Sequence, residues 1–313
     1  MLPARGVARR LPARSWPDGG GGAYGLAMVL AREPGRSVGA LLRGWRERRR
    51  LTQLGLAERA NVSTRRISFV ENGRSRPTSE MIIMLSEHLG VPLRERNQLL
   101  LAGGYAPAYS ENDLASPPMS AVSAAIDRVL AGLGPLPAAV IDRRWELVAA
   151  NDAIDLFTAG AAARLLEPPV NVLRLSLHPE GMAPRILNLP EWRTHLLDRL
   201  ARQADTTGDA VLHDLHTELS AYPVPDRGAN GVGHGAADDG ARGRAGRPAG
   251  LWTANGIVIP MRYRSPRGEL SLFTATTVFG TPTDVTVSEL AVETFFPADA
   301  HTAGLLYGSF EAS

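Results

Sequence analysis

The chain has 313 residues, an apolar fraction of 44% and a formal net charge of +2. Length and composition indicate a globular protein with two domains. The absence of cysteine excludes disulfides, thiolate metal sites and a cysteine nucleophile, and it suits a reducing compartment. No apolar run is long enough to span a membrane, and the N-terminus lacks the apolar core of a signal peptide. We therefore expect a cytoplasmic protein.

The small net charge hides an asymmetry along the chain. Residues 1–110 contain 18 arginines and eight acidic residues, a net charge of +10, whereas residues 111–313 carry a net charge of −8. A strongly basic domain is suited to a polyanion such as DNA. The first part of the chain is therefore the candidate for nucleic-acid binding.

In chain order, residues 1–36 are rich in Gly, Pro and Arg, lack apolar periodicity and are expected to be disordered. The next 70 residues show apolar periodicity with Ser or Thr at each expected helix start except the last. This pattern predicts five short helices, at 38–50, 52–60, 63–72, 78–89 and 93–102. Between the second and third helices, Asn61 is expected to take a left-handed conformation, which permits a tight turn. Residues 37–104 are thus predicted to form an all-α domain.

This segment resembles the Xre (Cro/CI-like) helix-turn-helix family. The resemblance covers about residues 38–104 and is carried by Thr52-Gln53, Leu56-Ala57, Val62-Ser63, Ile67-Ser68, Glu71-Asn72-Gly73, Pro77, and Leu85 with Leu89-Gly90-Val91. Asn61 departs from the family's usual Gly but tolerates the same backbone. The resemblance implies a lambda-repressor-like fold whose third helix enters the major groove of double-stranded DNA.

The resemblance also implies residue roles. Base contacts fall to the start of the third helix and to one residue a turn later, with Arg65 suited to guanine and Phe69 to a thymine methyl. Alternatives remain open, since Arg65 or Arg66 also suits a phosphate and Phe69 also suits the core. The expected DNA-binding residues are Gln53, Ser63, Thr64, Arg65, Arg66, Phe69, Arg74 and Arg76. Arg46 and Glu71 match a structural pair of the family that orients the third helix.

Residues 105–118 form a polar, proline-marked linker, and residues 119–313 predict an α+β domain. A helix at 119–130 is followed by a hairpin with strands at 138–141 and 145–149. Further helices are expected at 153–157, 171–177, 190–204 and 208–219, and strands at 256–264 and 268–278. Segments 287–296 and 300–306 close the domain. Residues 226–250 are of low complexity and are interpreted as a flexible insertion.

This half resembles the MmyB-like ligand-binding domain that follows Xre-type domains in many regulators. The matching stretches are 137–151, 171–184, 188–200 and 293–299. The resemblance implies a PAS-like fold with an antiparallel sheet and a small apolar or amphiphilic, often fatty-acid-like, ligand. Candidate ligand residues are Trp145, His178, Arg185, Trp192 and His195. The competing interpretation is core packing for the tryptophans, and helix ends or surface for the other three.

The sequence contains no convincing catalytic set, cofactor motif or metal site. His213 and His216 lie three apart on a predicted helix, a spacing that is more often packing or surface than a metal pair. No glycine-rich phosphate loop follows a strand. We therefore expect no enzyme activity, no cofactor and no metal.

These observations predict a multidomain transcription regulator that binds a palindromic operator as a homodimer and is controlled by a small ligand. One alternative is an antitoxin-like or scaffold protein that binds DNA and uses its acidic half for a protein partner. A second alternative, an enzyme with a DNA-binding tail, lacks a catalytic set.

Overall fold

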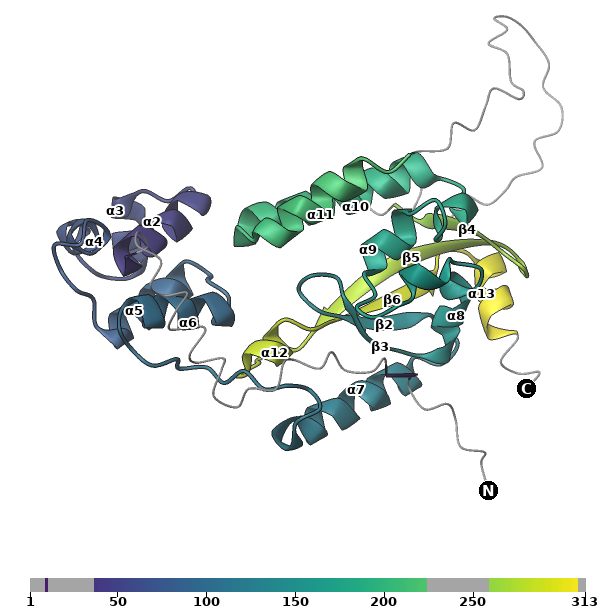
Figure 1. Ribbon diagram of the computed structural model, residues 1–313, viewed down its shortest axis with the longest axis horizontal. Coiled ribbons are helices and arrows are strands. Elements are labelled where there is room, and N and C mark those ends of the chain that lie inside the picture. The colour runs from purple at the N-terminus through teal and green to yellow at the C-terminus, as the bar shows by residue number, and fades with distance from the viewer. Residues whose placement is uncertain (1–8, 11–36, 224–258, 309–313) are drawn as a thin grey trace, which may run out of the picture.

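The computed structural model describes residues 9–10, 37–223 and 259–308. The described chain forms a helical N-terminal domain and a larger α+β domain, joined by an extended linker (Figure 1). This architecture confirms the predicted fold class. Among the described residues, no helix is long and apolar enough to span a bilayer.

The N-terminal domain is a bundle of five helices. They are α2 (Val38–Arg48), α3 (Gln53–Arg59), α4 (Thr64–Glu71), α5 (Ser79–His88) and α6 (Leu93–Ala102). The side chains of Ser37, Thr52, Ser63 and Thr78 each accept a backbone N–H in the first turn of the helix that follows. These caps satisfy amides that have no partner inside the helix, which fixes where each helix begins.

Two backbone positions bring the helices of this domain close together. A Cβ added at Gly39 would lie 2.1 Å from the carbonyl oxygen of Val70, so only glycine lets α2 cross α4 at this distance. Asn61 has φ of 52°, the left-handed conformation expected from the sequence, and it turns the chain from α3 into α4. The core between the helices contains fully buried Leu42, Leu56 and Ile67.

The second domain is built around an antiparallel sheet. Its helices are α7 (Ser120–Gly132), α8 (Asp155–Thr158), α9 (Val172–Leu177), α10 (Leu189–Thr207), α11 (Ala210–Ser220), α12 (Val285–Ser288) and α13 (Ala300–Tyr307). Its strands are β2 (Ala138–Ile141), β3 (Leu147–Ala150), β4 (Met261–Ser265), β5 (Gly268–Val278) and β6 (Ala291–Pro297). Short 3-10 turns occupy Pro117–Met119, Asp152–Ile154, Ala163–Leu165 and Ala183–Arg185. Most predicted elements are present within two or three residues of their expected bounds.

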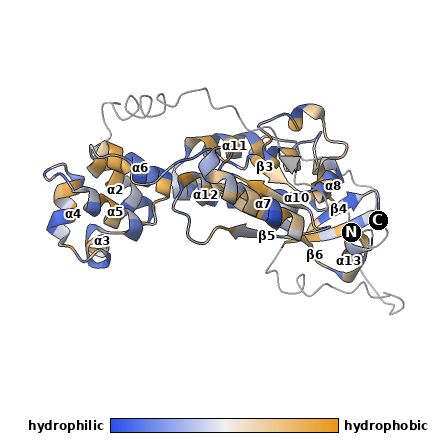
Figure 2. Ribbon diagram, turned by 90° about the horizontal axis from the view of Figure 1, so that it is seen from below, coloured by the Kyte–Doolittle hydropathy of each residue, from blue (hydrophilic) through white to orange (hydrophobic). Residues whose placement is uncertain are grey.

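The strands follow the order β1-β3-β2-β6-β5-β4, and each pair is antiparallel. Helix α7 packs on one face, where Val140, Ala149 and Val292 form a cross-strand row with Ile126 and Leu130 of the helix. Helices α9, α10 and α11 cover the other face and share its larger core. Figure 2, seen from below, shows α7 in front of the sheet. Successive residues of β2 therefore face opposite cores, as a strand covered on both sides requires.

The outer strand β1 comprises only Arg9–Arg10 and pairs with β3, Arg9 opposite Ala150. The expectation that residues 1–36 are disordered therefore differs from the structure at these two positions. The physical reason is that the free edge of β3 offers unpaired backbone groups to any nearby extended segment. Residues 1–8 and 11–36, and the predicted flexible insertion at 226–250, lie outside the described residues.

Candidate DNA interface and domain junction

The N-terminal turn of α4 presents the predicted DNA-reading residues to solvent. Ser63 caps the helix by accepting the backbone N–H of Arg66 at 3.2 Å, and Arg65 and Arg66 are exposed. The Phe69 ring is half-buried, with the guanidinium of Arg65 5.0 Å from its centroid and that of Arg74 at 6.0 Å. Phe69 thus contacts two cations at the surface and is not a fully buried core residue.

The orientation of α4 depends on a buried ion pair. Arg46 of α2 donates two hydrogen bonds to Glu71, at 2.6 and 2.8 Å, and a third to the carbonyl of Leu51 at 2.7 Å. The Glu71 side chain is 2% exposed. Hydrogen bonding to Glu71 is the largest factor that raises the pKa of Arg46. This bidentate pair ties the C-terminal end of α4 to α2, as the family resemblance implies.

Two of the predicted DNA contacts have partners within the protein. The side-chain amide of Gln53 donates to Glu71 at 2.9 Å, so Gln53 belongs to the network that orients α4. The Arg76 guanidinium donates to the carbonyl of Gly103 at 2.8 and 3.2 Å and lies over the Tyr105 ring. By contrast, no carboxylate among the described residues forms an ion pair with Arg65, Arg66 or Arg74. Arg65, Arg66 and Arg74 therefore leave exposed positive charge without a carboxylate partner on α4 and the loop after it.

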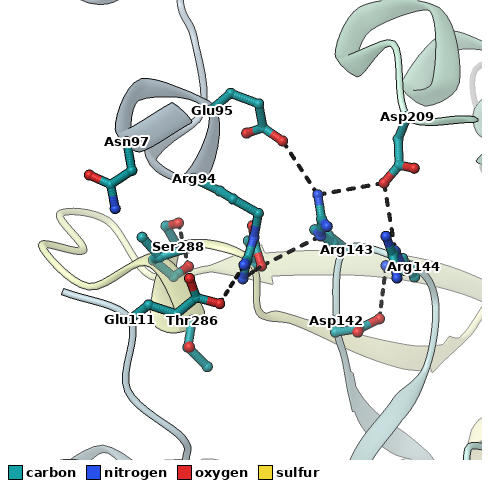
Figure 3. Close-up of polar contacts among 12 residues, drawn as sticks. Arg94, Glu95, Asn97, Glu111, Asp142, Arg143, Arg144, Asp209, Thr286 and Ser288 are labelled. Atoms are coloured by element: carbon teal, nitrogen blue, oxygen red, sulfur yellow. Dashed lines mark hydrogen bonds and ion pairs between the residues drawn. The ribbon is translucent and has the colours of Figure 1, made fainter. Parts of the chain in front are cut away.

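A second concentration of charge lies where the two domains meet (Figure 3). Arg94 of α6 donates to Glu289 at 2.7 and 2.9 Å and pairs with Glu111 of the linker. Arg143, from the β2–β3 turn, lies 3.4 Å from Glu95 of α6 and 3.7 Å from Glu289. The junction is therefore built from arginine–carboxylate pairs that cross between the domains.

Helix ends and the linker complete this junction. The Arg49 guanidinium donates to the carbonyls of Leu89 and Gly90 in the first domain and of Thr206 at the end of α10, at 2.9–3.0 Å. Cations are favoured at helix C-termini, where carbonyls lack partners. Asn97 of α6 accepts the N–H groups of Ala108 and Tyr109 at 3.1 Å, which holds the start of the linker against the bundle.

A cavity of about 320 Å³ lies at the junction. Pro92 and Glu95 come from the first domain, and the other lining residues come from the second. Burial raises the pKa of Glu95, and the nearby Glu289 raises it further, while Arg143 opposes the shift. Burial also raises the pKa of Asp142, which accepts the N–H groups of Arg144 and Glu146 within the hairpin turn.

Trp145 forms part of the cavity wall and has an unusual backbone. Its φ is 65°, a left-handed conformation that costs an aromatic residue roughly 1–2 kcal/mol. The indole is 5% exposed, donates to Gln203 at 2.8 Å and lies under the guanidinium of Arg199 at 4.5 Å. Gln203 in turn donates to the carbonyl of Arg143 at 2.7 Å. The buried ring therefore holds the turn that presents Arg143 to the first domain.

The other predicted ligand residues do not meet at this cavity. Trp192 is buried and donates to Ser176 at 3.2 Å, and the ring of His195 lies beside it. Burial lowers the pKa of His195, and Arg199 and Arg202 lower it further. His178 packs edge-on against Tyr222, and Arg185 donates to the carbonyls of Phe157 and Ala159. These four residues all contact other parts of the second domain. Of the five candidates, only Trp145 lines this cavity.

Within the described ranges, no group of three or more His, Cys, Asp or Glu residues is arranged to hold a metal ion. His213 and His216 both lie on α11, whose buried residues are Leu212, Leu215 and Leu219.

Comparison with protein families agrees with this architecture. Residues 122–307 match the MmyB-like transcription regulator ligand binding domain. The chain belongs to this family. Residues 42–96 match a helix-turn-helix family, which covers the core of the five-helix domain. No curated protein matches the chain. The chain is therefore a DNA-binding transcription regulator with a ligand-binding domain, and neither matching family is described as an enzyme.

Sequence reasoning missed the junction residues of this MmyB-like regulator. Arg49, Arg94, Glu95, Arg143 and Glu289 were not singled out, because each pair joins residues far apart in the chain. The available signal was the charge asymmetry, which we assigned wholly to DNA. The structure shows that Arg94 of the basic half pairs with Glu289 of the second domain, and that Arg49 donates to the Thr206 carbonyl. Arg143 of the acidic half pairs with Glu95 of the basic half.

Proposed function

We propose that the chain binds a palindromic operator as a homodimer, with α4 of each subunit in the major groove. This proposal rests on the exposed start of α4, where Arg65 and Arg66 have no carboxylate partner among the described residues. Arg65 donates to a guanine edge, Thr64 and Phe69 contact bases or thymine methyls, and Arg74 binds phosphate. The N-termini of α3 and α4 present free N–H groups to phosphates.

In a dimer, the second subunit places its own α4 on the other half of the operator. A single helix reads only a few base pairs, and helix-turn-helix proteins gain affinity by placing two helices about one DNA turn, roughly 34 Å, apart. The ligand-binding domain controls DNA affinity if its ligand prefers one arrangement of the two DNA-binding domains. We propose this control for the small ligand of the second domain.

An operator selected from a random DNA pool tests the DNA-reading role. Fluorescence anisotropy with Arg65→Ala is expected to show a loss of about 1–3 kcal/mol on the selected site and relaxed preference at one base pair. Arg128→Ala is the matched control, since Arg128 is exposed on α7 of the other domain. Equal weakening by both variants on all sequences contradicts base reading by Arg65.

Organic extraction of the purified protein, followed by mass spectrometry, tests the ligand-binding role. A retained small molecule supports it. An empty extract together with a stoichiometric co-purifying protein supports the alternative, in which the second domain binds a protein partner.

A further inference from the structure

We propose that the cavity between the domains binds a small organic cation, an ammonium or guanidinium group on an apolar body, and that this cation releases Arg143 from Glu95. The inference rests on the proposed function, because it locates the effector site at the junction of the two domains. A molecule that fills this cavity touches Pro92 and Glu95 on one side and the ligand-binding domain on the other. Its binding energy is therefore able to act on the interface between the domains.

The floor of the cavity suits an apolar body. Ile141, Ala291 and Val278 are consecutive partners across β2, β6 and β5, so they form one cross-strand row. All three line the cavity, together with the ring of Trp145 and the side chain of Leu290. A volume of about 320 Å³ lies at the lower end of the usual range for small-molecule sites.

The charges around this floor select a cation. Glu95, Asp142 and Glu289 line the cavity against two cations, Arg143 and Arg199. Arg199 is occupied by Glu293 at 2.5 Å and Thr276 at 2.9 Å. Arg143 is shared among three carboxylates at 3.4–3.7 Å, all longer than a good charge-assisted hydrogen bond. The anionic group of a ligand would enter a site with net negative charge, in which Arg143 and Arg199 already have carboxylate partners.

Glu95 is the least compensated of these carboxylates. Glu289 receives two hydrogen bonds from Arg94, and Asp142 receives two backbone N–H groups of its own turn. Among the described residues, Arg143 at 3.4 Å is the only cation within ion-pair distance of Glu95. The Glu95 side chain is 17% exposed, so a better-placed cation gains from reduced solvent screening. Glu95 is therefore the group to which the ligand's cation binds.

Release of Arg143 weakens one ion pair without collapsing the hairpin. The backbone of Arg143 stays fixed through Gln203 and the buried Trp145 ring. Its guanidinium keeps Asp209 and Glu289 as partners in the second domain. The ion pair that breaks is the one between Arg143 and α6 of the DNA-binding domain. A bound cation thus changes domain docking, and through docking the placement of α4.

Isothermal titration calorimetry of the full chain with three matched probes tests the ligand class. Octylammonium, octanoate and 1-octanol share one apolar body and differ in head charge. Octylammonium is expected to bind at least about tenfold more tightly than octanoate, with octanol between them. Equal affinity of the three probes, tighter binding of octanoate, or no binding of octylammonium overturns the proposal. Tight octanoate binding would instead support the fatty-acid-like ligand that the family resemblance implies.

Variants test the location. Glu95→Gln is expected to weaken octylammonium binding about tenfold, and Ala291→Leu, which fills the floor, to weaken all probes. The matched control is Glu87→Gln, because Glu87 of the same domain pairs with Arg96 at the same 3.4 Å distance but does not line the cavity. Unchanged binding in Glu95→Gln and Ala291→Leu, with circular dichroism showing intact folds, overturns the site.

A DNA titration separates this inference from the proposed function. Octylammonium is expected to change the dissociation constant for a selected operator at least about threefold in the wild type and not in Glu95→Gln. Binding without any change in DNA affinity overturns the coupling. Failure to bind any selected DNA contradicts the proposed function but leaves the order of probe affinities, and thus the cation site, as a separate result.

Discussion

The DNA-reading surface and the domain junction use the same residue type in opposite ways. On α4 and the loop after it, Arg65, Arg66 and Arg74 are exposed and have no carboxylate partner among the described residues. At the junction, Arg94 and Arg143 pair with carboxylates of the linker and the second domain. The first set leaves a positive field available for DNA phosphates, whereas the charge of the second set is neutralised inside the protein. The net positive charge of a domain therefore does not give the number of its DNA contacts.

The largest expected effect concerns the ion pair that supports the reading surface. Glu71→Ala leaves the buried Arg46 guanidinium with only the exposed carboxylate of Glu47, 3.7 Å away, and breaking a buried pair costs about 3–5 kcal/mol. We expect the free energy of unfolding, measured by urea denaturation, to fall by this amount and sequence-specific DNA binding to be abolished. The Gln53 amide loses its acceptor in the same variant.

The control for this variant is Glu47→Ala in the same domain. Glu47 is exposed, pairs with Arg43 one helical turn away at 2.7 Å, and lies 3.7 Å from Arg46. Solvent screens such pairs, so we expect no measurable loss of stability. Similar destabilisation by both substitutions would show that burial does not set the strength of the Arg46–Glu71 pair.

Salt dependence provides the next test of the comparison. Arg74→Ala is expected to reduce the slope of log affinity against log salt concentration by about 1, because the variant makes one phosphate contact fewer. At about 0.1 M salt this corresponds to a roughly tenfold loss of affinity on any DNA sequence. Arg94→Met removes one charge from the same domain and should leave the slope unchanged. A smaller slope in both variants would assign the junction arginine to DNA as well.

The junction itself is tested by a double-mutant cycle on Arg94 and Glu289. These residues form two hydrogen bonds across the domains and are both partly buried. We expect Arg94→Met and Glu289→Gln to show a coupling free energy of about 1 kcal/mol in the unfolding of the full chain. We also expect the wild type to unfold in one transition and the two variants to unfold in two. Additive effects with one transition would show that this pair does not join the domains.

Local rules predicted the helices and strands well. Helix α6 spans Leu93–Ala102 and strand β2 spans Ala138–Ile141, both as expected, because apolar periodicity, caps and helix-ending glycine or proline signals lie within a few residues. Asn61 took the expected left-handed turn for the same reason. The base-reading roles of Thr64, Arg65 and Phe69 stay predictions, since no DNA contact is part of the structure.

Contacts between distant segments escaped the sequence analysis. Arg94 and Glu289 are 195 residues apart, and nothing in the local pattern around either residue indicates the other. The phosphate contact of Gln53 stays a prediction, but the sequence pattern did not indicate that its amide donates to Glu71. The pairing of Arg9–Arg10 with β3 depends on a sheet edge formed about 140 residues later in the chain. Tertiary placement decides these roles.

The smallest expected effect is a pH dependence of stability that originates at Glu95. Burial raises the pKa of this carboxyl in the folded state, so the folded state binds more protons than the unfolded state between the ordinary and the raised value. Stability from this group is fully present below the unfolded pKa and is lost as the pH rises through the folded pKa. Thermal unfolding is measured between about pH 4 and pH 8. The melting temperature of Glu95→Gln minus that of the wild type should rise as the pH increases.

Asp142 adds a shift of the same sign and is present in both proteins, so the difference between the two curves isolates Glu95. Parallel curves would mean that the ion pair with Arg143 compensates the burial of Glu95, and the junction would then be tighter than its 3.4 Å contact indicates.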